Sequence, residues 1–367
     1  MLSTVPLVLS LLLFLQTPVK AFFNEQGDLN GRYYKGSRYR TCETLLERRE
    51  WRTLNDVEKA DYINAVKCLQ SHPALDPPIT QAQTRFDEFQ AYHSHIANAV
   101  HTVGQFLPWH RLYLKNYDSA LRSECGYTGT APYWDWTQDA EANSNNSISR
   151  SPVWDPLTGF GGDGVPGTYT LPTDFDDDSR INPPSFVGCV PDGPFANYTL
   201  RIGPGLLNTD HCLVRGFNES AAQHLTSAAI ANATKQQSFE LFRIEVEGQP
   251  LTSDHRMHDG GHIAIGGEMS NFFSSPGDPM FYLHHANIDR IWWTWQQAVP
   301  SRLYEIAGPS STVEPIYNVT LEYPLLMGSL GPTLQIRDIM DIHAEPSCYT
   351  YIRKPLSVDW DAFLRHS

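Results

Sequence analysis

The sequence lacks several features that mark common functional classes. Only 19% of its 367 residues are charged, and Lys and Arg number 27 against 41 Asp and Glu. The formal net charge of −14 disfavours nucleic acid and anionic membrane surfaces as partners, because both carry negative charge. No C-x-x-C pair occurs, so the sequence gives no support to a zinc site built from thiolates.

The sequence also lacks an apolar run long enough to cross a bilayer. One run near the N-terminus covers residues 5–15, which is 11 residues, whereas a membrane-spanning helix needs about 20. A short apolar run followed by small residues, here Val19 and Ala21, is typical of a cleaved secretion signal. We therefore expect a signal peptide at residues 1–21, a mature chain of residues 22–367 and a secreted protein.

Sequons and cysteines agree with passage through an oxidising secretory route. Five N-x-[S/T] sequons provide expected glycosylation sites at Asn145, Asn197, Asn218, Asn232 and Asn318. The six cysteines could form three disulfides, and the sequence alone does not choose among the pairings. They are Cys42, Cys68, Cys125, Cys189, Cys212 and Cys348.

The remaining composition is that of a globular protein with one unusual segment. The chain is 41% hydrophobic and 12% aromatic, which is enough to bury a substantial core. Residues 152–205 contain nine glycines and nine prolines, and this density disfavours regular helices and strands. Because the segment also holds aromatic residues such as Trp154 and Phe195, we expect an ordered loop and not a flexible linker.

Helical periodicity dominates on both sides of this loop. Apolar residues recur at a spacing of about 3.6 residues in five places. This spacing predicts helices at residues 55–69, 83–103, 108–125, 253–265 and 279–295. In residues 311–353, apolar and polar residues alternate in a pattern more typical of strands and turns. We expect a mainly α fold with long loops and a few short strands.

Six of the fourteen histidines have spacings that suit metal ligands. His93, His101 and His110 lie on two adjoining predicted helices. His258 and His262 form an i, i+4 pair, which presents two imidazoles to one point from a single helical face. A third ligand for this pair, His285, can join only through tertiary folding. We expect two metal sites, each with three histidines.

Sites built from imidazole alone favour copper, zinc or nickel. A blue copper centre is excluded as a match, because it needs a cysteine ligand beside two histidines. Two interpretations of the residues remain open. One is a zinc hydrolase, and the other is a pair of copper ions that bind dioxygen between them.

Longer motifs around these histidines resemble a known family. The segment "HSHIANAVHTVGQFLPWHRLYL" is similar to the first copper site of tyrosinases and catechol oxidases. The segments "MHDGGH" and "SSPGDPMFYLHHANIDRIWW" are similar to the second copper site, and "PYWDW" at residues 132–136 also resembles the family. The match extends over about residues 40–351, and it is strongest to the short secreted fungal members.

The resemblance implies a central four-helix bundle that holds two copper ions. The implied ligands are His93, His101 and His110 for the first ion, and His258, His262 and His285 for the second. His284 would not be a ligand. The resemblance also implies one catalytic domain over residues 22–367 without the C-terminal lid domain of latent members. That implication rests on Tyr349-x-Tyr351, which resembles the motif that closes the catalytic core.

Four further residues have roles implied by their positions. Phe272 resembles an aromatic residue that overhangs the second copper in plant catechol oxidases. Glu247 is similar to a glutamate that holds a water molecule, and Asp259 stands where several strong monophenol hydroxylases have Asn. Asp289 follows the last ligand by one helical turn, so it is placed to orient an imidazole or to pair with an arginine such as Arg290.

The resemblance implies a type-3 copper oxidase that uses dioxygen to oxidise small o-diphenols to o-quinones. The departures at Asp259 and Glu247 favour this activity over hydroxylation of monophenols. Alternatives are monophenol hydroxylation, oxidation of o-aminophenols or o-methoxyphenols, and a tailoring step on a phenolic secondary metabolite. A non-enzymatic oxygen carrier similar to haemocyanin is a remoter alternative. The sequence does not indicate the oligomeric state.

Overall fold

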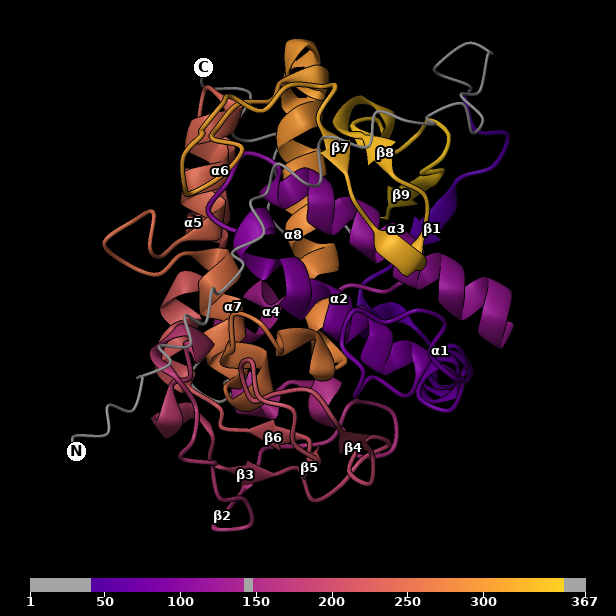
Figure 1. Ribbon diagram of the computed structural model, residues 1–367. Helices are drawn as coiled ribbons and strands as arrows, with labels where there is room; N and C mark the ends of the chain where they lie inside the picture. The colour runs from indigo at the N-terminus through magenta and orange to yellow at the C-terminus, as the bar shows by residue number, and fades with distance from the viewer. Residues whose placement is uncertain (1–40, 142–147, 353–367) are drawn as a thin grey trace, which may run out of the picture. The chain divides into compact units, whose positions relative to one another are not determined.

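A computed structural model describes residues 41–141 and 148–352 of the chain (Figure 1). Eight α-helices dominate these ranges, and the strands are two or three residues long. The predicted mainly α fold with long loops and a few short strands is therefore confirmed. None of the described helices combines the length and apolarity needed to cross a membrane. The expected signal peptide at residues 1–21 and the sequon at Asn145 lie outside the described residues.

All five predicted helices are present. They are α1 (Asp56–Leu69), α2 (Arg85–Val100), α3 (Phe106–Cys125), α7 (Met257–Ile265) and α8 (Met280–Ala298). Capping boxes begin α1 and α2, because the side chains of Asn55 and Thr84 accept hydrogen bonds from backbone N–H groups of the first turn. The C-cap of α3, Gly126, has the left-handed φ of 68° that glycine adopts without strain.

The helices differ from the prediction in number and in their boundaries. Three short helices were not predicted, namely α4 (Thr137–Ala140), α5 (Ser227–Thr234) and α6 (Phe239–Glu247). Ala233 is the one buried residue of α5, so that helix has no apolar stripe to detect. In addition, α2 ends at Val100, three residues before the expected stop, because His101 is extended and Thr102 has a φ of 60°.

The glycine- and proline-rich segment is an ordered loop, as predicted. It contains short 3-10 helices and three strands of two residues each. The strands are β2 (Val165–Pro166), β3 (Gly188–Cys189) and β4 (Thr199–Leu200). These strands pair with one another or with β5 (His211–Cys212) and β6 (Val214–Arg215). Figure 1 shows all five gathered on one side of the helices. The disulfide Cys189–Cys212 joins the loop to β5.

The ends of the described chain lie beside each other. Strand β1 (Leu46–Arg48) pairs in parallel with β9 (Tyr349–Tyr351), and the disulfide Cys42–Cys348 closes this pair. A second pair consists of β7 (Pro324–Leu325) and β8 (Leu334–Gln335). Cys68–Cys125 joins α1 to the end of α3, so the six cysteines form the three expected disulfides.

Four helices that carry the expected ligands pack in succession. Helix α2 packs on α3, α3 on α8, and α8 on α7. Aromatic rings fill the contact between α3 and α8, where the rings of Tyr117 and Tyr282 are parallel with centroids 3.5 Å apart. Both tyrosines are buried. This packing fixes the helices whose histidines face one another, while the regular geometry of a four-helix bundle stays a prediction.

A buried carboxylate on α8 joins the helices to the β1–β9 pair. Asp289 Oδ1 accepts a hydrogen bond from Arg111 Nε at 2.5 Å, and Oδ2 accepts from the hydroxyls of Tyr349 at 2.5 Å and Tyr351 at 2.6 Å. Arg48 Nη1 on β1 lies 3.5 Å from Oδ2. Burial raises the pKa of Asp289, but the guanidinium groups and hydroxyls outweigh it and hold the pKa below its usual value.

Replacing Asp289 with Asn should destabilise the fold strongly. The change leaves two guanidinium groups buried without a full counter-charge, and breaking a buried ion pair typically costs about 3–5 kcal/mol. Urea denaturation measures this loss. The matched control Glu322→Gln removes the exposed partner of Arg337 and should cost less than about 1 kcal/mol. Similar losses for the two variants would contradict the central position of Asp289.

Candidate metal centre

The first histidine group comes from α2, from the residue that follows it, and from α3. His93 lies on α2, His101 is the C-cap of that helix, and His110 lies on α3. Because His101 leaves the helix in an extended conformation, its ring turns toward the other two. One nitrogen of each ring lies within 4.8 Å of the others, and all three residues are buried.

Backbone carbonyls orient these three rings. The Nδ1···O distances are 2.9 Å from His93 to Phe273, 2.9 Å from His101 to Ala97 and 2.8 Å from His110 to Phe106. A carbonyl oxygen only accepts, so Nδ1 carries the hydrogen and Nε2 carries the lone pair. The Nε2 atoms of His93 and His110 are buried and have no hydrogen-bond partner among the described residues. Such atoms are suited to bind a metal ion.

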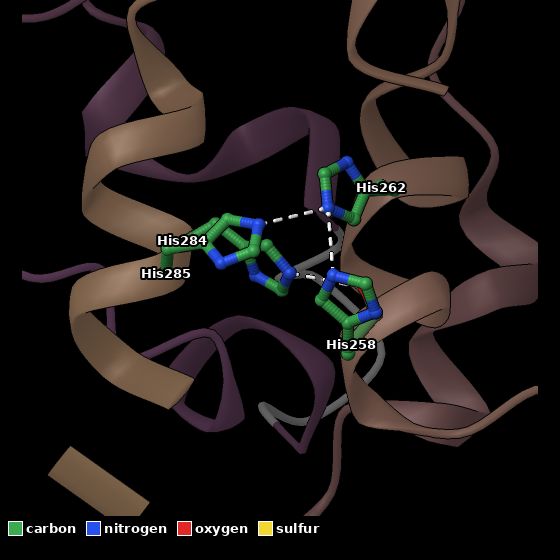
Figure 2. Close-up of side chains that lie close together, drawn as sticks. All are labelled: His258, His262, His284 and His285. Carbon is green, nitrogen blue, oxygen red and sulfur yellow. Dashed lines mark hydrogen bonds between the residues drawn. The ribbon is translucent and has the colours of Figure 1, made fainter. Parts of the chain in front are cut away.

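The second group contains four histidines from α7 and α8, and Figure 2 shows their rings gathered between the two helices. His262 Nε2 lies 3.2 Å from His258 Nε2 and 3.2 Å from His285 Nε2. The helices approach closely at Gly261, where an added Cβ would lie 2.1 Å from a ring carbon of His284. Backbone carbonyls again face Nδ1, at 3.3 Å for His258 and 2.6 Å for His262.

His284 differs from the other three because both of its nitrogens are engaged. Its Nε2 lies 3.0 Å from the carbonyl oxygen of His258. Its Nδ1 accepts a hydrogen bond from Trp136 Nε1 at 3.3 Å. Since Nε2 donates and Nδ1 accepts, no lone pair remains for a metal ion. The geometry favours His258, His262 and His285 as the ligands of the second group, and it gives Trp136 of the "PYWDW" motif a role in holding His284.

The two groups lie directly beside each other. The rings of His110 and His285 are stacked, with centroids 4.6 Å apart and an interplanar angle of 14°. His101 and His258 also face each other, with ring centroids 6.1 Å apart. Two metal ions bound to these groups would therefore share one small space, which suits a substrate that contacts both ions.

Burial keeps all of these imidazoles neutral. Desolvation is the largest cause in every case, and neighbouring imidazoles add to it for most of them. The pKa of His101 falls to about 3 and that of His262 to about 4. The pKa also lies well below the usual value for His93, His110, His258, His284 and His285. Neutral imidazole is the form that binds metal ions.

A cavity of about 120 Å³ opens beside the imidazoles. Pockets for drug-sized ligands have roughly 300–1,000 Å³, so this cavity suits a ligand with a single ring. The side chains that matter most for its chemistry are those of His101, His258, His262, Glu247, Asp259 and Phe272. Three of the four non-ligand residues singled out from the sequence therefore lie at the cavity.

Both carboxylates of the cavity are already engaged by other groups. Glu247 accepts hydrogen bonds from the backbone N–H of Thr102 and, at 2.8 Å, from Arg243 Nη1. Burial raises the pKa of Glu247 to about 7, although Arg243 opposes the shift. Asp259 Oδ2 lies 2.5 Å from His255 Nδ1. The role of Thr102 carries no sequence signal, because it depends on a contact between distant segments. Arg243 precedes Glu247 by four residues on α6, so the i, i+4 spacing of this pair could have indicated its contact.

Two neighbouring residues can be compared with what the sequence led us to expect. The ring of Phe272 lies 4.6 Å from that of His101 in the first group, and it also lines the cavity with His258 and His262 of the second group. Its place over the second copper stays a prediction. Asp289 pairs with arginines, as one of its two expected roles required, but the partners are Arg111 and Arg48 and not Arg290. No imidazole donates to it among the described residues. The reason is that α3 and the β1–β9 pair pack against this side of α8 and supply guanidinium and hydroxyl donors.

The segment that contains the site matches a known family. Residues 83–298 match the common central domain of tyrosinase. The tyrosinase-like protein phomQ1 of Diaporthe leptostromiformis is 35% identical over 339 residues, which cover 84% of this chain and 78% of that protein. The N-acetyl-6-hydroxytryptophan oxidase ivoB of Emericella nidulans is 31% identical, with 84% of this chain and 93% of that protein covered.

Solved structures share the fold. A mutant polyphenol oxidase from Thermothelomyces thermophila has a TM-score of 0.74 and 32% sequence identity, and the match covers 84% of this chain and 89% of that one. A functional unit of octopus hemocyanin has a TM-score of 0.52 and 21% identity, with 84% and 68% of the chains covered, which shows likeness of fold alone. By its sequence and its fold, the chain belongs to the tyrosinase family of type-3 copper oxidoreductases.

Proposed function

We propose that this protein oxidises o-diphenols to o-quinones with dioxygen at a pair of copper ions. The observation that carries the proposal is the contact between two buried three-histidine groups, whose rings meet 4.6 Å apart at His110 and His285. The proposed ligands are His93, His101 and His110 for one ion and His258, His262 and His285 for the other. A donor set of imidazoles alone, in which the Nε2 atoms of His93 and His110 have no hydrogen-bond partner among the described residues, fits copper.

The overall reaction balances with dioxygen as the oxidant. Two catechol molecules each lose two electrons and two protons, and one dioxygen takes up the four electrons and four protons to give two water molecules. When bound, the copper ions supply the one-electron steps and acidify the phenolic hydroxyls as Lewis acids. The carbonyls that hold Nδ1 fix the imidazole directions, and the ring of Phe272 narrows access to the cavity.

The engaged carboxylates favour diphenols over monophenols. Both oxygens of Glu247 accept hydrogen bonds from the protein, and Asp259 pairs with His255. Both carboxylates are therefore held in place by protein donors, and this disfavours them as acceptors of the hydroxyl proton of an incoming monophenol. The second candidate is another reaction at the same site. It could be monophenol hydroxylation, oxidation of o-aminophenols or o-methoxyphenols, or a tailoring step on a phenolic metabolite. The name of the relative N-acetyl-6-hydroxytryptophan oxidase supports a narrow natural substrate.

We also propose that the protein is secreted and glycosylated. Three disulfides support an oxidising destination. Four of the five sequons are described, and their asparagines are exposed at Asn197, Asn218, Asn232 and Asn318. The signal peptide at residues 1–21 and the single catalytic domain over residues 22–367 stay predictions.

Oxygen uptake tests the proposed reaction directly. The copper-loaded protein should consume one dioxygen for every two molecules of 4-methylcatechol and form the o-quinone, whereas the metal-free and zinc-loaded proteins should consume none. The matching monophenol, 4-methylphenol, should react at least tenfold more slowly, because both carboxylates of the cavity are held in place by protein donors. Copper-loaded protein that binds dioxygen reversibly without oxidising the catechol would contradict the proposal in favour of an oxygen carrier.

The two adjacent histidines of α8 should separate a ligand from a structural residue. His285→Ala should lower the copper content from two ions per chain to about one and abolish activity. His284→Asn retains a donor and an acceptor, so it should keep two copper ions. Metal analysis after gel filtration measures both values. The assignment is wrong if His284→Asn loses copper or if His285→Ala retains both ions.

Acid should destabilise the metal-free protein. Imidazoles of the unfolded chain titrate near pH 6.5, whereas the buried ones have lower pKa values, about 4 for His262 and about 3 for His101. The contribution of these neutral rings to the free energy of unfolding is fully present above pH 6.5. It is lost as the pH falls toward the pKa values of the folded state, by up to about 1.4 kcal/mol per pH unit for each ring. The melting temperature should therefore fall steeply from pH 7 to 5.

Copper should shift this acid transition to lower pH, because it binds the neutral imidazoles of the folded state alone. Thermal melts of metal-free and copper-loaded protein across the same pH range test this. A metal-free melting temperature that stays flat from pH 7 to 5 would mean that the imidazoles are not held neutral by burial.

A further inference from the structure

An exposed arginine lies against the wall of the cavity. The guanidinium carbon of Arg180 is 4.0 Å from the centre of the Phe272 ring. The same ring lines the cavity and lies 4.6 Å from the ring of His101. One aromatic ring thus joins an exposed positive charge to the proposed copper site. Arg180 belongs to the glycine- and proline-rich loop, whose composition gave no reason to expect a contribution to the site.

The backbone of Arg180 is held in place beside Phe272. Asn271 Nδ2 donates to the carbonyl oxygens of Ser179 at 3.1 Å and Arg180 at 3.2 Å. Asn271 Oδ1 accepts from the backbone N–H of Phe273 at 2.9 Å, so one buried amide joins the two turns. Arg180 itself has a φ of 48°, which costs energy for a residue with a Cβ. Its position is therefore determined by tertiary contacts and not by local preference.

The positive charge of Arg180 has no acidic partner among the described residues. Its guanidinium donates one hydrogen bond, from Nη2 to Asn98 Oδ1 at 3.0 Å. The nearby Asp176 carboxylate is turned to the backbone N–H and hydroxyl of Ser179. A guanidinium carries five N–H donors in a planar fork, so most of those of Arg180 remain available.

The guanidinium of Arg180 lies close to the proposed ligands, because the Phe272 ring that it covers also contacts the ring of His101. The carboxylates inside the cavity do not compete for this charge, because Glu247 is engaged by Arg243 and Asp259 by His255. At the mouth of the cavity, an anion would find one fixed and unpaired cation.

We infer that Arg180 is a specificity-determining residue that binds a carboxylate carried by the phenolic substrate. The inference deepens the proposed function and rests on it. The catechol ring would enter the cavity beside Phe272, and a short side chain would present its carboxylate to the guanidinium outside. A guanidinium and a carboxylate form two parallel charge-assisted hydrogen bonds, which a neutral amide does not match.

Paired substrates test this inference. The carboxylate 3-(3,4-dihydroxyphenyl)propanoate and its primary amide differ in charge but share the catechol ring and chain length. At low ionic strength the copper-loaded protein should prefer the carboxylate about tenfold in kcat/KM. Arg180→Gln should lower this ratio to about one, Arg180→Lys should retain part of it, and Arg180→Glu should bring it below one. Added salt should reduce the ratio of the unaltered protein.

A second arginine provides a matched control. Arg49→Gln removes the same charge from an ion pair with Glu58 at the surface, and it should leave both the ratio and the rates unchanged. Equal kcat/KM values for the two substrates, or a ratio in Arg180→Gln as high as in the unaltered protein, would overturn the inference. Failure to oxidise either substrate would overturn the proposed function itself, so the two failures are distinguishable.

Discussion

The hydrogen bond from imidazole Nδ1 to a backbone carbonyl is the interaction on which the site depends. Five of the six proposed ligands have a carbonyl oxygen within 3.3 Å of Nδ1. Each such bond selects the tautomer whose lone pair is on Nε2 and fixes the direction of that lone pair. Since the carbonyls belong to the backbone, the geometry of the metal centre is set by the fold before any ion binds.

A few buried polar contacts between distant segments fix the positions of those carbonyls. Asp289 ties α8 to α3 and to the β1–β9 pair through two guanidinium groups and two hydroxyls. Trp136 holds His284, which in turn donates to the carbonyl of His258. Asn271 joins the loop to the turn that carries the Phe273 carbonyl, the partner of His93. Substrate selection by Arg180 would use the same anchored turn.

Much of the helical fold could be predicted from the sequence, because it follows from local spacing. The grouping of the histidines followed from their spacing and from the family resemblance, except for His285, which joins its group only through tertiary folding. Apolar periodicity located five of the eight described helices, and the i, i+4 spacing of His258 and His262 required only one helical face. The contacts that could not be predicted were those whose partners come from elsewhere in the chain. Asp289 faces guanidinium groups because α3 happens to pack there, and Phe272 contacts His101 because a long loop fixes its turn. Short-range patterns contain no information about either contact.

Crystallography of the copper-loaded protein, with anomalous data collected at the copper edge, tests the proposed ligands of both ions. We expect two copper peaks between the α2–α3 and α7–α8 pairs. Each should be bound by three imidazole Nε2 atoms, with His284 bound to neither. A single peak, a ligand other than these six histidines, or coordination by His284 would contradict this ligand assignment.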